Sequence, residues 1–378
     1  MNSRPRLPVF SLLSLLVCCS LCGPLWATGE RTAAGPLAEP LTAQDSAGLR
    51  QAPEPVQAAG PQSYANETSP LFPVVEGGRW GYIDKTGRIV IPPQYDSADP
   101  FFEGLAQVWI GDKVGYIDTT GQIVIAPQYD PHVGTSLGFS EGLARARVSE
   151  KIGYIDKTGK MVIPPQYEAG DGFSEGLAAV RVGDKWGYIG KTGDMVIPSQ
   201  YEVAAEFSEG LAEVRVGDKW GYIDKTGQMV IPPQYSNTRK FSEGLAAVQK
   251  DFCKWGYINK TGKIAIPLRY SSAFGFYEGL AAVAKKGFFN WKLGYIDKAG
   301  KMVIPPRYSR AEEFSDGLAQ VVVGDKVGYI DKIGKMVIPP QFADGAGGNF
   351  FEGLDRVWVD DKMGYIDKTG KYVWAPTK

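Results

Sequence analysis

The stretch FSEGLAAVRVGDKWGYIGKTGDMVIPSQY, residues 173–201, alternates short apolar runs with turn residues. This alternation is typical of short β-strands joined by tight turns. The following stretch of the chain repeats the pattern closely, and its three β-type runs are residues 211–216, 220–224 and 228–231. We therefore expect each copy to fold as a three-stranded β-meander.

The turn residues between these runs support the meander. Gly217 and Asp218 can supply the positive φ angles of a tight hairpin turn. Gly227 suits the left-handed position that closes the second turn. Pro232 and Pro233 end the third run, because proline cannot donate a hydrogen bond to a β-ladder.

The same unit recurs along most of the chain. Gly-Tyr-Ile followed by Asp, Asn or Gly occurs nine times, with spacings of 34 to 38 residues. The glycines of these copies are Gly81, Gly115, Gly153, Gly187, Gly221, Gly256, Gly294, Gly328 and Gly364. A regular period of this length indicates a repeat architecture, in which one unit buries its apolar face against the next.

The composition of the chain excludes helical repeats with this period. The 378 residues include 47 glycines and 26 prolines, and the repeat region has no stretch longer than 11 residues without one of them. Two-helix repeats need longer uninterrupted segments.

The chain carries 41 basic and 42 acidic side chains, so it has no net positive charge to hold a polyanion. We do not expect nucleic acid as a partner.

The first 27 residues have the features of a secretory signal peptide. Arg4 and Arg6 precede an apolar run over residues 9–22, and a small residue, Ala27, ends the segment. The run is shorter than the roughly 20 residues that span a bilayer. We expect a secreted or periplasmic protein that does not span the membrane after cleavage. An uncleaved anchor, or a lipid attached to Cys22, is the alternative.

Residues 28–70 are rich in Ala, Pro, Gly and Gln and lack hydrophobic periodicity. This composition predicts a disordered linker. The expected domain order is therefore a signal peptide over 1–27, a linker over 28–70 and nine β-repeats over 71–378.

The repeat resembles the bacterial WG repeat family. The Trp-Gly pair of that family occurs here at Trp80, Trp186, Trp220 and Trp255, each followed by glycine. The other five copies hold Val114, Ile152, Leu293, Val327 and Met363 at the Trp position. The resemblance covers residues 71–378. It implies an exported or surface β-repeat protein without a generally assigned activity, and it supplies no catalytic residues.

The Trp position and the tyrosine after the glycine are candidates for the core of the repeat. Val, Ile, Leu and Met lack the π face that a stacking platform needs, so the Trp position requires bulk and apolarity. The tyrosine is present in all nine copies and is expected to bury its ring. The predicted core set is Trp80, Tyr82, Tyr116, Tyr154, Trp186, Tyr188, Trp220, Tyr222, Trp255, Tyr257, Tyr295, Tyr329 and Tyr365.

Candidate catalytic and metal motifs fail on chemistry. Gly134-Thr-Ser136-Leu-Gly138 matches the nucleophile-elbow pattern, but it lies in a loop and its one His, His132, comes before the serine. One His and one cysteine beyond the signal, Cys253, exclude a conventional zinc cluster. We predict no catalytic residue, no metal and no cofactor.

An acidic residue precedes Gly-Leu in eight copies of the unit. A catalytic acid is needed once, so we interpret these carboxylates as turn residues that bond nearby backbone amides. The eight are Glu103, Glu141, Glu175, Glu209, Glu243, Glu278, Asp316 and Glu352.

Variable positions in the first strand are the candidates for binding. In Leu-Ala-x-Val-x-Val the two x positions point to one face, because strand side chains alternate. We predict that they form an exposed ladder suited to an acidic glycan or an acidic protein loop. The candidate residues are Trp109, Arg145, Arg147, Arg181, Arg215, Gln249, Arg356 and Trp358. A solvated face without a ligand is the alternative.

Strand count decides the predicted architecture. Propeller blades usually have four strands in 40 to 45 residues, whereas these units show three in about 35. We therefore expect an all-β, open superhelical β-solenoid of about 27 strands, with a closed propeller-like toroid as the alternative.

The expected function is that of an exported, non-enzymatic binding or scaffold protein with an unknown protein or envelope glycan as partner. A carbohydrate-binding protein is the second possibility and a hydrolase the third.

Overall fold

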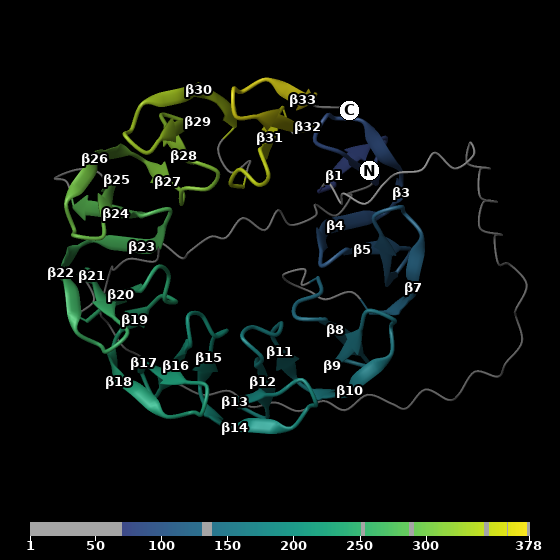
Figure 1. Cartoon of the computed structure of the whole chain (residues 1–378), viewed down its shortest axis with the longest axis horizontal. Coiled ribbons are helices and arrows are strands. Elements are labelled where there is room, and N and C mark those ends of the chain that lie inside the picture. The colour runs from purple at the N-terminus through teal and green to yellow at the C-terminus, as the bar shows by residue number, and fades with distance from the viewer. Residues whose placement is uncertain are drawn as a thin grey trace, which may run out of the picture. The chain divides into compact units, whose positions relative to one another are not determined.

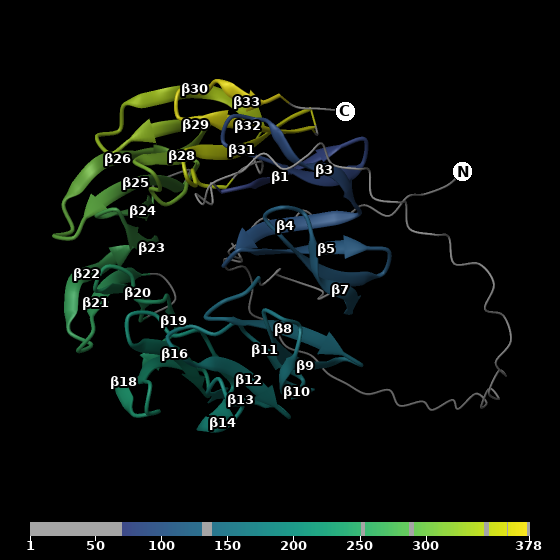
Figure 2. The same cartoon turned by 45° about the vertical axis from the view of Figure 1, so that its right-hand side comes forward.

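The computed structural model describes residues 70–130, 138–250, 254–286, 291–343, 348–360 and 362–375. These residues form nine antiparallel sheets that follow one another along the chain. The sheets are arranged as blades around a ring (Figures 1 and 2). The prediction of an all-β protein is confirmed, but the prediction of an open solenoid is wrong: the structure is a nine-bladed β-propeller.

The blades are numbered 1 to 9 in chain order. Blades 1 to 3 contain β1 (Phe72–Glu76), β2 (Arg79–Ile83), β3 (Ile89–Tyr95); β4 (Ser97–Phe102), β5 (Leu105–Ile110), β6 (Lys113–Asp118), β7 (Ile123–Tyr129); and β8 (Leu143–Val148), β9 (Lys151–Asp156), β10 (Met161–Tyr167). Blades 4 to 6 contain β11 (Ala169–Gly170), β12 (Ala178–Val182), β13 (Lys185–Ile189), β14 (Met195–Tyr201); β15 (Val203–Ala204), β16 (Leu211–Val216), β17 (Lys219–Asp224), β18 (Met229–Tyr235); and β19 (Asn237–Thr238), β20 (Leu245–Gln249), β21 (Trp255–Asn259), β22 (Ile264–Tyr270). Blades 7 to 9 contain β23 (Ser272–Tyr277), β24 (Leu280–Lys286), β25 (Trp291–Asp297), β26 (Met302–Tyr308); β27 (Arg310–Ala311), β28 (Leu318–Val323), β29 (Lys326–Asp331), β30 (Met336–Ala343); and β31 (Leu354–Val359), β32 (Lys362–Asp367), β33 (Tyr372–Trp374).

A fourth, innermost strand precedes the meander in six of the described blades. In blade 4 it is only two residues long and pairs Ala169 with Arg181 and Gly170 with Val180. Such a short strand carries no apolar alternation, so the sequence pattern did not reveal it. The three strands counted from the sequence were therefore one too few, and this removes the argument against a propeller.

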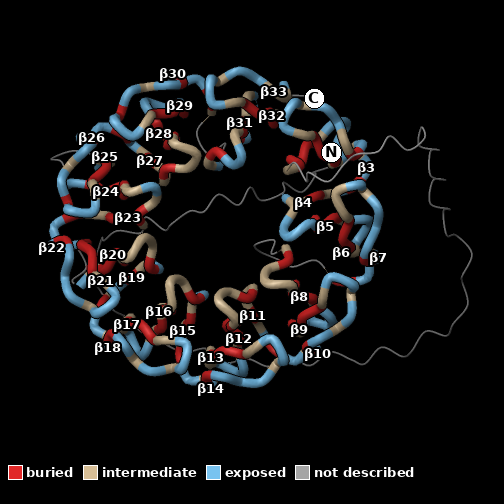
Figure 3. Tube along the Cα trace, viewed as in Figure 1, coloured by how far each residue is buried: buried red, intermediate tan, exposed pale blue. Residues whose placement is uncertain are grey.

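Neighbouring blades pack face to face. In blade 4, Leu177, Ala179 and Tyr188 point toward blade 5, where they meet Ala212 and Val214 within one core cluster. Both faces of a blade are covered in this way, while the outermost strands are exposed (Figure 3). The hydrophobic core is thus divided into layers of side chains, one between each pair of neighbouring blades.

The repeated tyrosine crosses each of these spaces. The Tyr188 ring lies 4.9 Å from the Phe207 ring of the next blade, and its hydroxyl donates to the Ala205 carbonyl at 2.7 Å. All nine tyrosines are between 0 and 5% exposed. At the Trp position Trp255 is buried, whereas Trp80, Trp186 and Trp220 are half-buried.

The ring closes between blade 9 and blade 1 without a shared sheet. The Tyr365 hydroxyl donates to the Pro73 carbonyl at 3.0 Å, and its ring lies 5.5 Å from that of Phe72. Lys85 of blade 1 pairs with Glu352 of blade 9 at 2.8 Å. A strand shared between the first and last blades is not needed for this closure. Side-chain contacts of the kind that join the other blades provide the closure instead.

Several sequence predictions lie outside the described residues. They are the signal peptide over 1–27, the linker over 28–69, Cys22, His132, Ser136 and Cys253. Within the part of the chain that the structure describes, no helix is long and apolar enough to cross a membrane.

Candidate functional site

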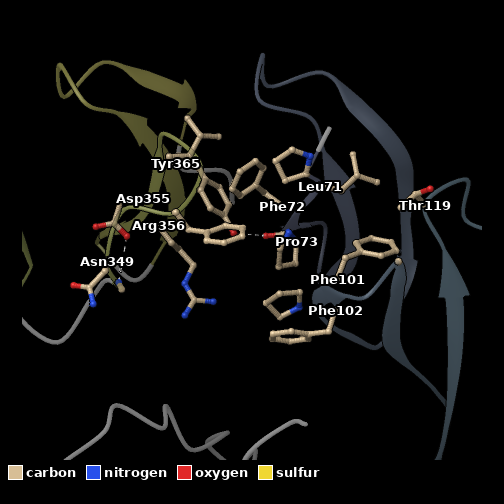
Figure 4. A pocket seen from close by; sticks show the side chains of 16 residues that line it. Leu71, Phe72, Pro73, Phe101, Phe102, Thr119, Asn349, Asp355, Arg356 and Tyr365 are labelled. Carbon is tan, nitrogen blue, oxygen red and sulfur yellow. Dashed lines mark hydrogen bonds between the residues drawn. The ribbon is translucent and has the colours of Figure 1, made fainter. Parts of the chain in front are cut away.

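A pocket of about 460 Å³ lies where blades 9, 1 and 2 meet. We call it the seam pocket. Blade 1 contributes the start of β1, blade 2 contributes β4, and blade 9 contributes residues 348–356 (Figure 4). Its walls are mainly apolar and include Leu71, Phe72, Pro73, Phe101, Phe102 and Phe351. A concave, largely apolar space of this size with a few polar groups is the usual form of a ligand pocket.

Two phenylalanines of the pocket replace a repeated serine. The residue before the turn acid is serine in five blades, and there its hydroxyl bonds the next blade, as Ser208 Oγ does with the Phe241 carbonyl at 2.8 Å. Phe102 and Phe351 occupy this position on either side of blade 1, and they are 44% and 64% exposed. Replacing serine with phenylalanine removes an interblade hydrogen bond and adds exposed aromatic surface. This favours a binding role for the two phenylalanines.

Asp355 departs from the repeat at a buried position. The equivalent residue is alanine in blades 2 to 8, for example Ala212. The Asp355 carboxylate is 2% exposed and accepts hydrogen bonds from the Tyr329 hydroxyl at 2.8 Å and the Gly348 amide at 3.3 Å. Burial raises the pKa of Asp355 to about 7, against the lowering effect of these hydrogen bonds. The side chain therefore holds the inner segment of blade 9, which forms one wall of the pocket.

Two polar groups in the pocket have no partner. The Arg356 side chain is exposed, and within the described residues it makes no hydrogen bond or ion pair. The Asn349 Oδ1 atom is buried and likewise has no hydrogen-bond partner in the described part of the chain. Figure 4 shows the Arg356 side chain extending from β31, with Asn349 to one side and Phe102 to the other. The pocket thus offers a cationic donor, whereas the buried Asn349 oxygen points away from Arg356 (Figure 4).

The turn acids link each blade to the next through hydrogen bonds and ion pairs, and this series of links is interrupted at the seam pocket. Seven of the eight acids bond the turn amides of the next blade, as Glu175 does with the Gly210 N–H at 3.0 Å, and this confirms their structural interpretation, while Glu352 pairs with Lys85. A lysine of that next blade pairs with the same acid, as Lys225 does with Glu175 at 3.0 Å. In blade 2 the lysine position holds Thr119, and Thr119 lines the pocket. Four departures from the repeat, at Phe102, Thr119, Phe351 and Asp355, therefore meet at one junction of the ring. Others, such as Tyr277 at the serine position of blade 7, lie outside it.

The residues of the predicted binding face do not form an exposed ladder. Trp109, Arg147, Arg181, Arg215, Gln249 and Trp358 are all half-buried and lie in different blades. Each faces the next blade, because a propeller covers both faces of its sheets. Within its own blade, Arg215 lies 6.0 Å from the Trp220 ring centroid, so its charge is set against an aromatic ring. Arg145 is also half-buried and donates to the Gly170 carbonyl of the next blade.

Of the eight predicted binding residues, Arg356 lines the seam pocket. Trp358 packs near it, in the cluster that joins blades 9 and 1. Sequence reasoning missed Phe102, Phe351 and Asp355. Their signal was present as departures from Ser and Ala in the repeat, but only the closed ring shows that these positions come together.

No metal site emerges from the described side chains: none of their His, Cys, Asp and Glu residues form a group of three or more that could hold an ion.

The fold and the pocket define a class, a β-propeller that presents a pocket at the junction of its first and last blades. The model of the WG containing repeat matches residues 80–113, 115–151, 152–186, 186–220, 220–251, 255–287, 294–326 and 328–362. The chain belongs to this family.

Solved structures with similar folds have low scores. BamB from Moraxella catarrhalis is 11% identical with a TM-score of 0.43, covering 73% of this chain and 97% of that one. AztD from Citrobacter koseri is 12% identical with a TM-score of 0.39, covering 80% and 92%. Hsv2p from Kluyveromyces lactis is 13% identical with a TM-score of 0.39, covering 61% and 89%. Likeness at this level says nothing about the ligand of this chain. No curated protein matches it.

Proposed function

We propose that the protein is an exported, non-enzymatic binding propeller that acts at the cell envelope or outside the cell and holds a partner protein at the seam pocket. The observation that carries this proposal is the convergence of departures from the repeat. Phe102, Phe351, Asp355 and Thr119 each replace a common residue of the unit, and all four line one pocket. Features needed only for folding would recur around the ring, as the tyrosines do.

Exposed aromatic side chains support a binding role over a folding role. Phe351 and Phe102 gain little by burial, and the serine of the other blades offers an interblade hydrogen bond instead. Aromatic residues in a desolvated pocket are typical anchors of protein interfaces. The features of residues 1–27 support export.

The test returns both phenylalanines to the serine of the repeat. The full chain, the double variant Phe102→Ser/Phe351→Ser and the control Ile333→Thr are used to capture partners from an envelope preparation. Ile333 is a matched control because it is 79% exposed, replaces the threonine of the repeat and lies outside the pocket. We expect the same identified partner with the wild type and the control, and its loss with the double variant.

Thermal unfolding of each variant shows whether it is folded. Retention of the same partner by a folded double variant would contradict the proposal. Glycan binding stays the alternative prediction, and isolated cell-wall polymer is its probe.

A further inference from the structure

We propose that the seam pocket recognises the C-terminal residue of a polypeptide. In this arrangement an apolar side chain fills the pocket and the terminal carboxylate pairs with Arg356. This inference rests on the proposed function, because it names the part of the partner that the pocket holds.

The walls determine the apolar part of the ligand. Phe72, Phe101, Phe102 and Phe351 surround the space together with prolines, and such walls favour an aromatic or large aliphatic group. The exposure of Phe102 and Phe351 places them at the rim, so the preceding residues of a bound chain can leave the pocket past them.

Arg356 determines the charge of the ligand. Its two acidic neighbours in the chain are engaged elsewhere: Glu352 pairs with Lys85, and Asp355 accepts from Tyr329 and Gly348. Arg356 makes no ion pair with a carboxylate of the described residues, although its charge acts on the neighbouring Asp355, so its exposed guanidinium is complementary to an anion. Its planar donors match both oxygens of a carboxylate.

The proposed function determines that the carboxylate is a chain terminus, because the partner held at the pocket is a protein. Asn349 supplies no contact to it, since the Asn349 Oδ1 atom is buried and Figure 4 shows it pointing away from Arg356. Asp355 acts as a positioning residue, because its bond to the Gly348 amide orders the segment that forms one wall of the pocket.

The experiment uses three fluorescent pentapeptides and the full chain. One peptide ends in phenylalanine with a free carboxylate, the second is the same peptide with a C-terminal amide, and the third ends in serine with a free carboxylate. Anisotropy titrations give the dissociation constants. We expect the free acid ending in phenylalanine to bind about tenfold or more tightly than either of the others, since a charge-assisted hydrogen bond and an apolar anchor are each worth that much.

Two variants separate the contacts. Arg356→Gln should reduce the ratio of acid to amide affinity to about one, while leaving the amide peptide little changed. Phe351→Ser should weaken both phenylalanine peptides by the same factor, because both retain the apolar side chain. Arg147→Gln is the matched control, since Arg147 lies in β8 and outside the pocket, and it should keep the wild-type ratio.

Equal affinity of the acid and amide peptides, or no binding of either, would overturn this inference. The outcome is separable from that of the proposed function. If the peptides fail while Phe102→Ser/Phe351→Ser still loses the identified partner, the pocket binds a protein by another feature. If the double variant keeps the partner, the proposed function fails, whatever the peptides do.

Discussion

Single residues show how the repeat tolerates variation inside a constant frame. Trp186 and Trp220 lie directly across from Arg181 and Arg215 in the neighbouring strand. In blades 2 and 9 the arrangement is reversed, because Trp109 faces Val114 and Trp358 faces Met363. In these four blades each cross-strand pair supplies one tryptophan to the same space between blades, from either strand. Filling that space is therefore the shared requirement, which a comparison of single positions does not show.

The glycine after the Trp position has a steric cause. The third strand carries a bulge, and a Cβ atom on Gly221 would lie 2.5 Å from the Ile231 carbonyl oxygen. We predict that Gly221→Ala lowers the free energy of unfolding by about 1–3 kcal/mol, measured by urea denaturation. Gly217→Ala is the control, because open space surrounds Gly217 and only its positive φ resists alanine. Equal or greater loss in the control would contradict this explanation.

Glu213 gives stability a pH dependence. Burial of Glu213 raises its pKa to about 7, although Arg239 and Lys240 act in the opposite direction. Since the folded state holds the proton more tightly, the free energy of unfolding should fall as pH rises from about 4.5 to about 7, by about 3 kcal/mol. We predict that Glu213→Gln makes the fall smaller by that amount and is more stable than the wild type at pH 8. The part of the fall that comes from Asp355, whose pKa burial also raises to about 7, should remain. Denaturation at several pH values tests this, with the exposed Glu150→Gln as a control that should retain the fall.

At the scale of elements, the turn before each long strand joins two blades. The acids of these turns adopt a left-handed backbone, for example φ 53° at Glu175, which is unfavourable for a residue with a side chain. The bond of the carboxylate to the next turn offsets this cost. The short innermost strands have a similar role, since they add a ladder without adding apolar surface.

The two partners of a turn acid should differ in their effect on stability. We predict that Glu175→Ala lowers the free energy of unfolding by about 1–3 kcal/mol, because it removes the acceptor of the Gly210 amide. Lys225→Ala should cost only about 0.2–1 kcal/mol, because its ion pair with Glu175 is partly exposed to solvent. Urea denaturation of both variants provides the comparison. A loss from Lys225→Ala as large as that from Glu175→Ala would show that the ion pair carries the stability.

At the scale of the whole molecule, the seam is the junction where closure depends on residues far apart in the chain. Tyr365 and Pro73 are 292 positions apart, yet their bond repeats the link between neighbouring blades. No short loop connects the two blades at this junction. Bringing the two ends of the repeat region together therefore costs the conformational entropy of closing a long loop. A ligand bound across blades 9, 1 and 2 would stabilise the closed ring by mass action.

Removing an aromatic contact at the seam should therefore open the ring locally. We predict that Phe72→Ala, which removes the ring next to Tyr365, accelerates hydrogen exchange of the amides in β1 and β32 by tenfold or more, while β16 and β17 are unchanged. Phe207→Ala is the matched control, since its ring meets Tyr188 in the same way. It should accelerate exchange in blades 4 and 5 and leave β1 protected. Exchange that rises evenly around the ring in the Phe72 variant would argue against local opening.

The all-β class, the nine units and their turns could be read from the sequence, because they depend on interactions within about 35 residues. Gly227 and the paired prolines, for instance, act on their own turn and strand. Ring closure could not be read in this way. It depends on the rotation between neighbouring blades, which side-chain packing determines and which accumulates over the whole array. The seam pocket belongs to this second group: Phe102 and Phe351 are both visible as departures from serine, but they share a pocket only because the last blade meets the first.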